Sequence, residues 1–378
     1  MLGHVTTPQL DSILKGVSRS IFLTLQVAPR SMRPVVGVAY LFCRAADTIA
    51  DTRLLSQQVR LEYLGRFRAQ FECSTPRFDE IACLARQVGT AEQIPEEQRL
   101  LKELSECFRL YLNLDPHDRD RIRRLVTTLT RGMETDLTYF PAEESGRVKA
   151  LERDAALDHY TYHVAGCVGE FWTELQVAHV RALASWDLSI MSDRGMRFGK
   201  GLQLTNILRD VDGDLQLGRC YLPEPWLRRV GTTAEELRTG TGRDRLLPLL
   251  ARYLHRTLDF YQSGWDYVLS IPRRAVRLRL ACAWPLLIGL RTLEELALSE
   301  SPYAHGTVRK ITRPEIYQIL RSSTFRSLSN RALTQLYHRL ESQVQDAIAR
   351  LPQLPSDLGA NDFDRLSVMP LGDAIRDS

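Results

Sequence analysis

The segment QLTNILRDVDGDLQLGR, residues 203–219, places three aspartates within five positions of an otherwise apolar region with helical periodicity. Asp210 and Asp214 are four residues apart, so a helix carries both carboxylates on one face, about one turn from each other. Asn206 and Gln203 precede Asp210 by four and seven residues and extend the same face. The pattern therefore predicts a helix whose polar stripe presents two amides and two carboxylates.

This segment has three interpretations: a solvated surface, a calcium loop, or half of a metal site. The calcium loop fits poorly, because DVDGDLQLGRCY has glycine at its fourth position and tyrosine at its twelfth, in place of glycine at the sixth and a bidentate glutamate. A solvated helix face stays open, since a chain with 46 acidic residues contains several such pairs by chance. Asp212 lies off the stripe, and we expect it to be dispensable for binding.

A second acidic pair lies in AYLFCRAADTIADT, residues 39–52, where Asp47 and Asp51 have the same spacing in apolar surroundings. Like charges at this spacing repel each other, and a hard cation would offset the repulsion. Arg44 and Arg209 each stand within a helical turn upstream of a pair. Two such helices facing each other would hold Mg²⁺ ions that bridge a diphosphate and stabilise it as a leaving group.

The composition is that of a globular chain of 378 residues, 44% hydrophobic and 25% charged. A formal net charge of +4 argues against a dedicated nucleic-acid binder. Seven cysteines without a CxxC pair indicate free thiols in a reducing cytosol. We expect no signal peptide, and the most apolar run, residues 280–290, is too short to span a bilayer. These features predict a cytoplasmic protein, soluble or at most peripheral to a membrane.

Helical periodicity dominates the chain, and strand-like alternation is hard to find. Apolar residues recur at spacings of three and four in residues 61–74, 100–114, 121–140, 246–270 and 332–351. No linker or repeat divides the chain. The sequence therefore predicts an all-α fold, with one large helical domain over residues 1–350 and a loosely packed tail over residues 351–378.

Glycines interrupt the apolar helical run LDHYTYHVAGCVGEFWTEL, residues 157–175. Gly166 and Gly169 each cost about 1 kcal/mol of helix stability relative to alanine. Two explanations stay open: a close contact with another helix, or room for a bulky apolar ligand. Tyr160, Tyr162 and His163 are the polar groups of this run, and a tyrosine in an apolar cavity can move a proton or stabilise a cation with its ring face.

Four segments together resemble the motifs of the squalene/phytoene synthase family, the head-to-head branch of the class I isoprenoid synthases. They are SRSI (18–21), YLFCRAADTIAD (40–51), YTYHVAGCVG (160–169) and QLTNILRDVDGDLQLGRCYLP (203–223), in the family's order and at similar spacings. The resemblance covers most of residues 15–320. It implies an all-α fold with a central apolar cavity and two aspartate motifs that face each other across its mouth.

The resemblance also implies roles for individual residues. The Mg²⁺ ligands would be Asp47, Asp51, Asp210 and Asp214, and Tyr160 would be the catalytic tyrosine. The residues that would bind the diphosphates are Ser18, Arg19, Ser20, Tyr40, Arg44, Gln203, Asn206 and Arg209, joined by Arg219 in a flap-like segment. One prenyl diphosphate would ionise to an allylic cation, and the double bond of a second would attack it to form a cyclopropyl diphosphate. Ionisation of that intermediate would end in hydride transfer from NADPH or in proton loss, inside a cavity that excludes water.

Two further stretches favour the squalene branch, and because we find no C-terminal membrane helix we expect a soluble enzyme of the bacterial type. Residues 278–296 resemble the end of the cavity in squalene synthases, and residues 306–317 resemble a basic element that contacts the NADPH phosphate. Lys310 and Arg313 are the candidate contacts, with Arg19, Arg44 and Arg209 as further candidates. We therefore expect a farnesyl-diphosphate farnesyltransferase that uses Mg²⁺ and NADPH to make squalene.

Several alternatives stay open. The first is a phytoene or dehydrosqualene synthase, the second an enzyme that stops at presqualene diphosphate, and the third a non-catalytic helical scaffold. The basic stretch PRRAVRLRL, residues 272–280, has two interpretations. It is either a site of transient contact with a membrane surface, where a water-insoluble product would leave, or a solvated helix face.

Overall fold

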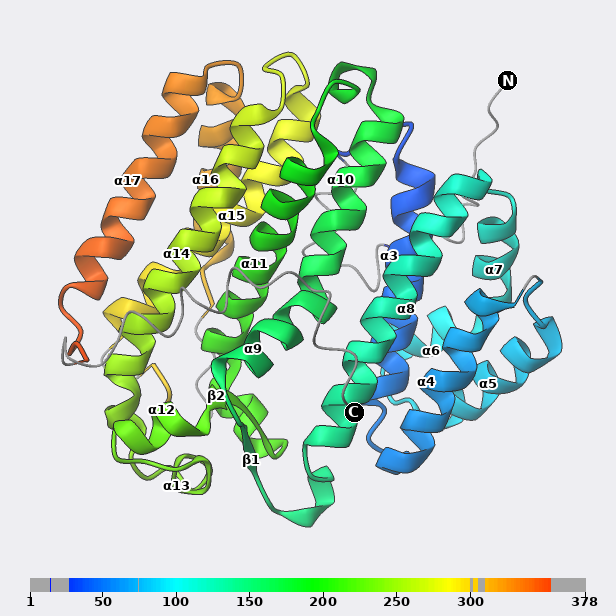
Figure 1. The fold of residues 1–378 in the computed structure, drawn as a ribbon, viewed down its shortest axis with the longest axis horizontal. Coiled ribbons are helices and arrows are strands. Elements are labelled where there is room, and N and C mark those ends of the chain that lie inside the picture. The colour runs from blue at the N-terminus through cyan, green and yellow to red at the C-terminus, as the bar shows by residue number, and fades with distance from the viewer. Residues whose placement is uncertain (1–13, 15–26, 74, 300–301, 305–309, 355–378) are drawn as a thin grey trace.

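The computed structural model describes residues 14, 27–73, 75–299, 302–304 and 310–354. Helices account for nearly all of the secondary structure in this part of the chain, and the predicted all-α class is confirmed. The helices, labelled as in Figure 1, are α3 (Arg33–Asp51), α4 (Gln57–Glu72), α5 (Phe78–Ala91), α6 (Pro95–Lys102), α7 (Leu104–Leu112), α8 (Pro116–Tyr139), α9 (Asp154–Thr161), α10 (Cys167–His179), α11 (Leu188–Gln216), α12 (Glu224–Arg229), α13 (Ala234–Arg238), α14 (Leu247–Ser270), α15 (Val276–Leu298), α16 (Arg313–Arg326) and α17 (Asn330–Ile348). Short 3-10 helices are η1 (Glu143–Ser145), η3 (Arg181–Leu183) and η4 (Arg243–Leu246), and a turn of π-helix is η2 (Tyr162–Gly166).

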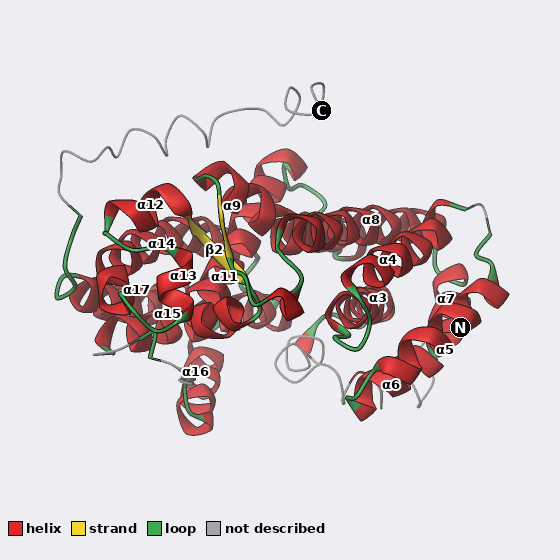
Figure 2. Ribbon diagram, turned by 90° about the horizontal axis from the view of Figure 1, so that it is seen from below, coloured by secondary structure: helices red, strands yellow, loops and turns green. Residues whose placement is uncertain are grey.

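The long helices run up and down in one bundle, with α3 to α8 on one side and α9 to α17 on the other (Figure 1). Helix α11 is central, because it packs against α10, α14 and α15. Helices α3 and α11 run in the same direction, so the acidic ends of both helices lie at the lower end of the bundle in Figure 1. Figure 2 views the molecule from that end.

Two short strands, which the sequence did not predict, also lie at this end of the bundle. β1 (Lys149–Leu151) and β2 (Arg219–Pro223) pair in parallel, with Lys149 opposite Arg219 and an irregularity after Ala150. Three and five residues are too short to show an alternating pattern. Gly218 makes the turn into β2 possible: its φ is +78°, and a Cβ there would lie 2.6 Å from the backbone oxygen of Arg147.

Most predicted helices are found within a few residues of their expected bounds. α4, α8, α14 and α17 correspond to four of the periodic runs, whereas residues 100–114 belong to two helices, α6 and α7, that meet at Glu103. Side-chain caps explain several starts: Asp115 accepts from the backbone NH of His117, and Ser329 from that of Ala332. Residues 355–378 of the predicted tail lie outside the described residues, and the domain boundary at 350 stays a prediction.

Aromatic side chains dominate the core between α3, α4 and α7. Phe42, Phe67, Phe71, Phe108 and Tyr111 form one cluster, with ring centroids 4.7–6.4 Å apart. Such rings bury large areas and prefer the tilted and edge-on arrangements seen here. In the described part of the chain, no helix combines the length and the apolar character needed to cross a membrane.

The glycines of η2 and α10 lie where these elements pack tightly against α11. A Cβ on Gly169 would lie 1.9 Å from the backbone oxygen of Gly195 on α11. Gly166 is also close to α11, because a Cβ there would lie 3.2 Å from Cγ of Met196. Of the two explanations for the glycines, the structure therefore supports the close helix contact.

This packing generates a prediction that compares two glycines. Gly169→Ala should lower the free energy of unfolding by about 2 kcal/mol or more, because neither backbone can move aside without disturbing the core. Gly213→Ala should raise it by up to about 1 kcal/mol, since helix propensity improves and a Cβ at Gly213 meets nothing within 4 Å. Urea denaturation measures both changes. An unaltered midpoint for Gly169→Ala would contradict the close contact.

Candidate active site

The last turns of α3 carry the first acidic pair. Arg44 Nη1 lies 3.8 Å from Asp47 Oδ2, one turn along the helix, and its Nη2 pairs with Glu97 Oε1 of α6. Glu97 is 5% exposed and also accepts from Thr48 Oγ1 at 2.9 Å. Arg44 is thus held between two carboxylates. The sequence analysis missed Glu97, because a glutamate in the first turn of a helix usually lies in solvent and stabilises the helix dipole.

Helix α11 carries the predicted polar stripe. Asn206 Nδ2 donates to Gln203 Oε1 at 3.4 Å, which places the two amides on one face. Arg209 donates from Nε and Nη2 to the two oxygens of Asp210, at 2.8 and 2.5 Å. The stripe ends at Asp214, whose side chain is partly buried. Both acidic pairs therefore have an arginine in contact with their first aspartate.

Asp212 points away from this stripe, as its position in the sequence indicates. Its Oδ1 lies 2.6 Å from Nη2 of Arg243 in η4, and both side chains are nearly buried. Arg243 also donates to the backbone oxygens of Leu237 and Tyr303. Asp212 therefore fastens α11 to the segment before α14, which is a structural role.

Asp51 of the first pair and Asp214 of the second lie within electrostatic reach of each other. Burial raises the pKa of Asp214 to about 7; Asp210, Asp136 and Asp51 add to the shift, and Arg219 opposes it. Burial, followed by Asp51, raises the pKa of Asp47 to about 7 as well. Asp51 on α3 is therefore close enough to act on Asp214 of α11. The site concentrates negative charge in a partly desolvated space.

Asp136 of α8 is a site residue that the sequence analysis missed. Its two carboxylate oxygens accept from the hydroxyl of Tyr221 at 3.0 and 3.1 Å, and Oδ2 lies 3.4 Å from Arg219 Nη1. Burial raises the pKa of Asp136 to about 6, although Arg219 and the Tyr221 hydroxyl oppose the shift. The sequence contained a signal for Asp136. It follows Ile122 and Leu129 at intervals of seven residues, and because both are buried, Asp136 is a charged residue on the buried face of its helix.

Arg219 of β2 joins this network to the end of α3. Its Nη2 lies 3.1 Å from Glu143 Oε1, which also accepts from Arg60 Nη1 at 3.3 Å. Arg60 is 2% exposed and donates to the backbone oxygen of Ala50 at 2.9 Å. Burial alone would lower the pKa of Arg219, but the surrounding acidic groups outweigh it and raise the pKa. Arg219 is thus a cation that pairs with the carboxylates of Asp136 and Glu143.

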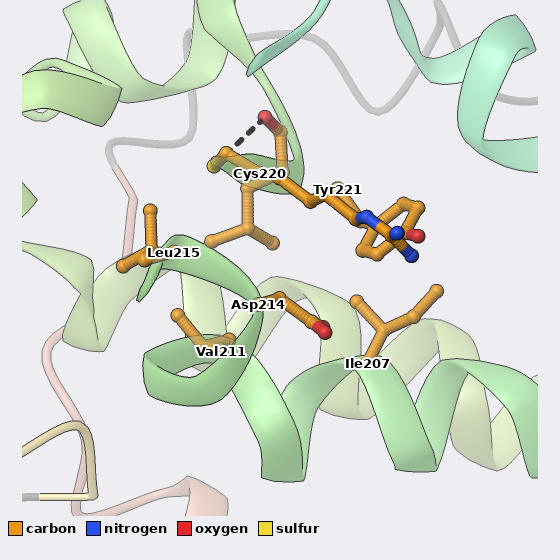
Figure 3. A pocket seen from close by; sticks show the side chains of 8 residues that line it. Ile207, Val211, Asp214, Leu215, Cys220 and Tyr221 are labelled. Carbon is orange, nitrogen blue, oxygen red and sulfur yellow. Dashed lines mark hydrogen bonds between the residues drawn. The ribbon is translucent and has the colours of Figure 1, made fainter. Parts of the chain in front are cut away.

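Tyr160 of α9 lies against this network. Its ring stacks on that of Tyr221, with centroids 4.4 Å apart and planes 23° apart. Burial, the nearby Asp136 and then Asp214 raise the pKa of Tyr160, so its phenol is neutral at any physiological pH. Beside it, a pocket lies between α11 and β2, with Ile207, Val211 and Asp214 across from Cys220 and Tyr221 (Figure 3).

Not every predicted residue joins this cluster. Lys310 and Arg313 are exposed, and none of the ion pairs between described residues connects them to the aspartates. The start of α16 is fixed by a capping box between Thr312 and Glu315, and Glu315 pairs with Arg291 of α15. The predicted residues Ser18, Arg19 and Ser20 lie outside the described residues.

The aspartates suit a metal that is bound together with its substrate. In the described ranges, no three His, Cys, Asp or Glu side chains form a group that could hold an ion. Mg²⁺, however, usually takes only one or two protein carboxylates and completes its shell with water and phosphate oxygens. The like-charge crowding that raises the pKa values of Asp47 and Asp214 would be relieved by such a cation. The residues present therefore fit Mg²⁺.

Comparison with known proteins agrees with this geometry. The chain matches the sequence profile of the squalene/phytoene synthase family over residues 14–315. It belongs to this family. The members of the family are prenyltransferase-type enzymes of isoprenoid biosynthesis. The recognition of the four motifs in the sequence is thereby confirmed.

Its relatives differ in their reactions. A bifunctional lycopene cyclase/phytoene synthase from Blakeslea trispora is 32% identical over 61% of this chain and 34% of that protein. A presqualene diphosphate synthase from Rhodopseudomonas palustris is 28% identical over 73% of this chain and 84% of that protein. The squalene synthase of Saccharomyces cerevisiae is 24% identical over 83% of this chain and 66% of that protein. The chain spans between 34% and 46% of the length of the fungal bifunctional proteins that it matches.

Solved structures share the fold. A ligand complex of TcSQS has a TM-score of 0.65 and 24% identity, covering 90% of this chain and 98% of that chain. A ligand complex of a dehydrosqualene synthase has a TM-score of 0.54 and 20% identity, and the match covers 88% of this chain and 95% of that chain. The helical fold is therefore that of the isoprenoid synthases of this family.

The crowded carboxylates generate a prediction about stability. In metal-free protein, Asp214→Asn should stabilise the fold more at pH 8 than at pH 5. The pKa of Asp214 is about 7 in the folded protein, against an ordinary value of 3.8 in an unfolded chain. Between pH 3.8 and pH 7 the unfolded chain therefore binds fewer protons than the folded protein, and the free energy of unfolding of the wild type falls as the pH rises. Urea denaturation in the presence of a chelator, at both pH values, measures the effect.

The control is Asp346→Asn, which removes the same charge from an exposed position on α17. It should change the free energy of unfolding little at either pH. An equal effect of Asp214→Asn at pH 5 and pH 8 would contradict the raised pKa.

Proposed function

We propose that this protein condenses two molecules of farnesyl diphosphate head to head, with Mg²⁺, to presqualene diphosphate, and reduces this intermediate with NADPH to squalene. The observation that carries the proposal is that the acidic ends of α3 and α11 lie together at one end of the bundle (Figure 1), where burial, Asp210 and, to a smaller extent, Asp136 and Asp51 raise the pKa of Asp214. Such a concentration of carboxylates beside Arg44, Arg209 and Arg219 suits a site for cations and diphosphates together.

The acidic pairs Asp47 and Asp51, and Asp210 and Asp214, would hold Mg²⁺, which neutralises the charge that develops on a departing diphosphate. Arg44 and Arg209 now contact Glu97 and Asp210, and they can offer their remaining donors to diphosphate oxygens. Gln203 and Asn206 extend this polar face along α11 toward the apolar interior. Ionisation would therefore begin at the polar end, with the prenyl chains among apolar side chains.

Tyr160 would act on the carbon skeleton of the substrate. Its neutral phenol lies near Asp214, and its ring stacks on Tyr221 beside the pocket. An aromatic ring face can stabilise an allylic cation, and a phenol can relay the proton that leaves when the cyclopropane ring closes. Asp136 accepts a hydrogen bond from the hydroxyl of Tyr221 and pairs with Arg219, so it positions the stacked rings.

Residues 278–296 and 306–317 favour the squalene branch, and Lys310 and Arg313 are exposed and can receive the phosphate of NADPH. A second candidate is a presqualene diphosphate synthase, which releases the cyclopropyl intermediate. It is favoured by the Rhodopseudomonas palustris relative, which the chain matches over 84% of its length. A phytoene-type reaction is favoured by the relative of 32% identity.

Product analysis tests these candidates. The purified protein is incubated with farnesyl diphosphate and Mg²⁺, with and without NADPH, and in parallel with geranylgeranyl diphosphate. We expect squalene only when NADPH is present, no reaction with a chelator, and no turnover by Asp47→Asn. Dehydrosqualene as the main product with NADPH, phytoene from the longer substrate, or accumulation of presqualene diphosphate would each reject squalene as the product.

A pair of aspartate variants tests the arrangement of the site. Asp136→Asn should lower turnover about 10- to 100-fold, because the amide loses the charge that positions Arg219 and the Tyr160–Tyr221 stack. Asp212→Asn is the matched control: it should lower the melting temperature by leaving Arg243 uncompensated, but keep the turnover of the folded enzyme. Initial rates of diphosphate release, normalised to folded protein, measure both. Equal losses of turnover would contradict the different roles of these two carboxylates.

A further inference from the structure

The end of the bundle opposite the aspartates brings together several helix ends. There α3, α11, α15 and α17 begin and α10, α14 and α16 end, at the upper end in Figure 1. Ser31 Oγ donates to the backbone oxygen of His179 at 3.2 Å, which ties the start of α3 to α10. Arg194 Nη1 donates to Ser270 Oγ at 3.1 Å and ties α11 to the end of α14. These segments form one continuous face.

Arginines crowd this face. Five of them are exposed, on the segment before α3, in η3 after α10, in the connection from α14 to α15 and in the first turn of α15: Arg30, Arg181, Arg273, Arg274 and Arg277. Burial, then Arg277 and Arg30, lower the pKa of Arg33, so these guanidinium groups repel each other across the helix starts. Asp187 and Asp193 are exposed carboxylates at the start of α11. The face therefore carries a net positive charge.

Large apolar side chains are exposed on the same end. Leu188 and Ile190 at the start of α11 are 43% and 54% exposed. Phe325 and Leu328, at the turn between α16 and α17, are 81% and 64% exposed, next to the exposed Arg331. Exposed apolar side chains that lie among basic residues mark an interaction surface. The five exposed arginines named above form, with five more residues, a surface that we call the basic end. The five further residues are Leu188, Ile190, Phe325, Leu328 and Arg331.

We propose that the basic end docks on an anionic lipid bilayer. Guanidinium groups attract the phosphate-bearing headgroups, and the exposed phenylalanine, leucine and isoleucine side chains enter the boundary between headgroups and acyl chains. A nucleic acid would match the charge of the arginines but would leave these apolar side chains without a partner. The bilayer accounts for both kinds of side chain at once.

This orientation leaves the aspartate end facing water, where diphosphates arrive in solution. The opposite end rests on the bilayer, into which an uncharged hydrocarbon dissolves. The proposed function gives the reason for this docking, and in that respect the inference rests on it. The binding to the bilayer itself does not depend on the reaction. The exposed arginines of PRRAVRLRL accordingly belong to the membrane contact, which is one of the two interpretations that the sequence left open, whereas Arg279 of the same stretch is buried.

Co-sedimentation with lipid vesicles tests the docking. The intact protein should sediment with phosphatidylcholine vesicles that contain about one-third phosphatidylserine, but not with phosphatidylcholine alone. Added salt should weaken the binding, because it screens exposed charges. The variant R273E/R274E/R277E should reduce partitioning at least about tenfold. The variant F325S/L328S should also reduce it, without any change in charge.

The matched control is R86E/R228E/R339E, which makes the same charge change at exposed positions on α5, α12 and α17. It should bind like the wild type, and the melting temperature of each variant shows whether it is folded. Equal binding by the two triple variants, no binding to anionic vesicles, or binding to a mixed-sequence oligonucleotide in preference to vesicles would each overturn the proposal. Diphosphate release measured in the same samples separates the two ideas: vesicle binding without chemistry contradicts only the proposed function, and chemistry without vesicle binding contradicts only the docking.

Discussion

The repulsion between carboxylates at the meeting ends of α3 and α11 is the constraint on which the rest of the structure depends. Asp47, Asp51, Asp210 and Asp214 crowd the acidic ends of these helices, and burial together with neighbouring carboxylates raises the pKa values of Asp47, Asp51 and Asp214. A folded protein tolerates this arrangement only if cations are close and the helices cannot separate. Arginines on α3, α11 and β2 supply the charge, and a tightly packed bundle supplies the rigidity.

The surrounding ion pairs connect these requirements. Arg219 reaches Asp136 of α8 and Glu143 of η1, and Glu143 in turn holds the buried Arg60 beside the end of α3. The short β1–β2 pairing fixes the backbone of Arg219, and the left-handed conformation of Gly218 turns the chain toward it. On the other side of α11, the contact at Gly169 sets the distance to α10. The site is therefore held by elements from four separate stretches of the chain.

The two ends of the bundle have opposite characters. One end gathers carboxylates and partly buried arginines, which suits small, highly charged molecules from solution. The other gathers exposed arginines and large apolar side chains, which suits an extended lipid surface. Because the helices run the full length of the bundle, the same helix, α11, contributes Asp210 and Asp214 to one end and Leu188 and Ile190 to the other.

The sequence by itself determined the helical class, the acidic stripes on α3 and α11 and the family, because i to i+4 spacing is local geometry that any helix imposes. It also showed that Asp212 lies off its stripe. Only the tertiary structure decided which groups meet: that Asp51 acts on Asp214, that Glu97 and Asp136 belong to the site, that Gly169 serves packing, and that two short strands place Arg219. It also left Lys310 and Arg313 exposed, and no ion pair between described residues joins them to the aspartates. The physical reason is that contacts between helices depend on how whole helix faces pack against each other. The sequence places Asp136 on the buried face of α8, but only the packing shows that its partners are Tyr221 and Arg219.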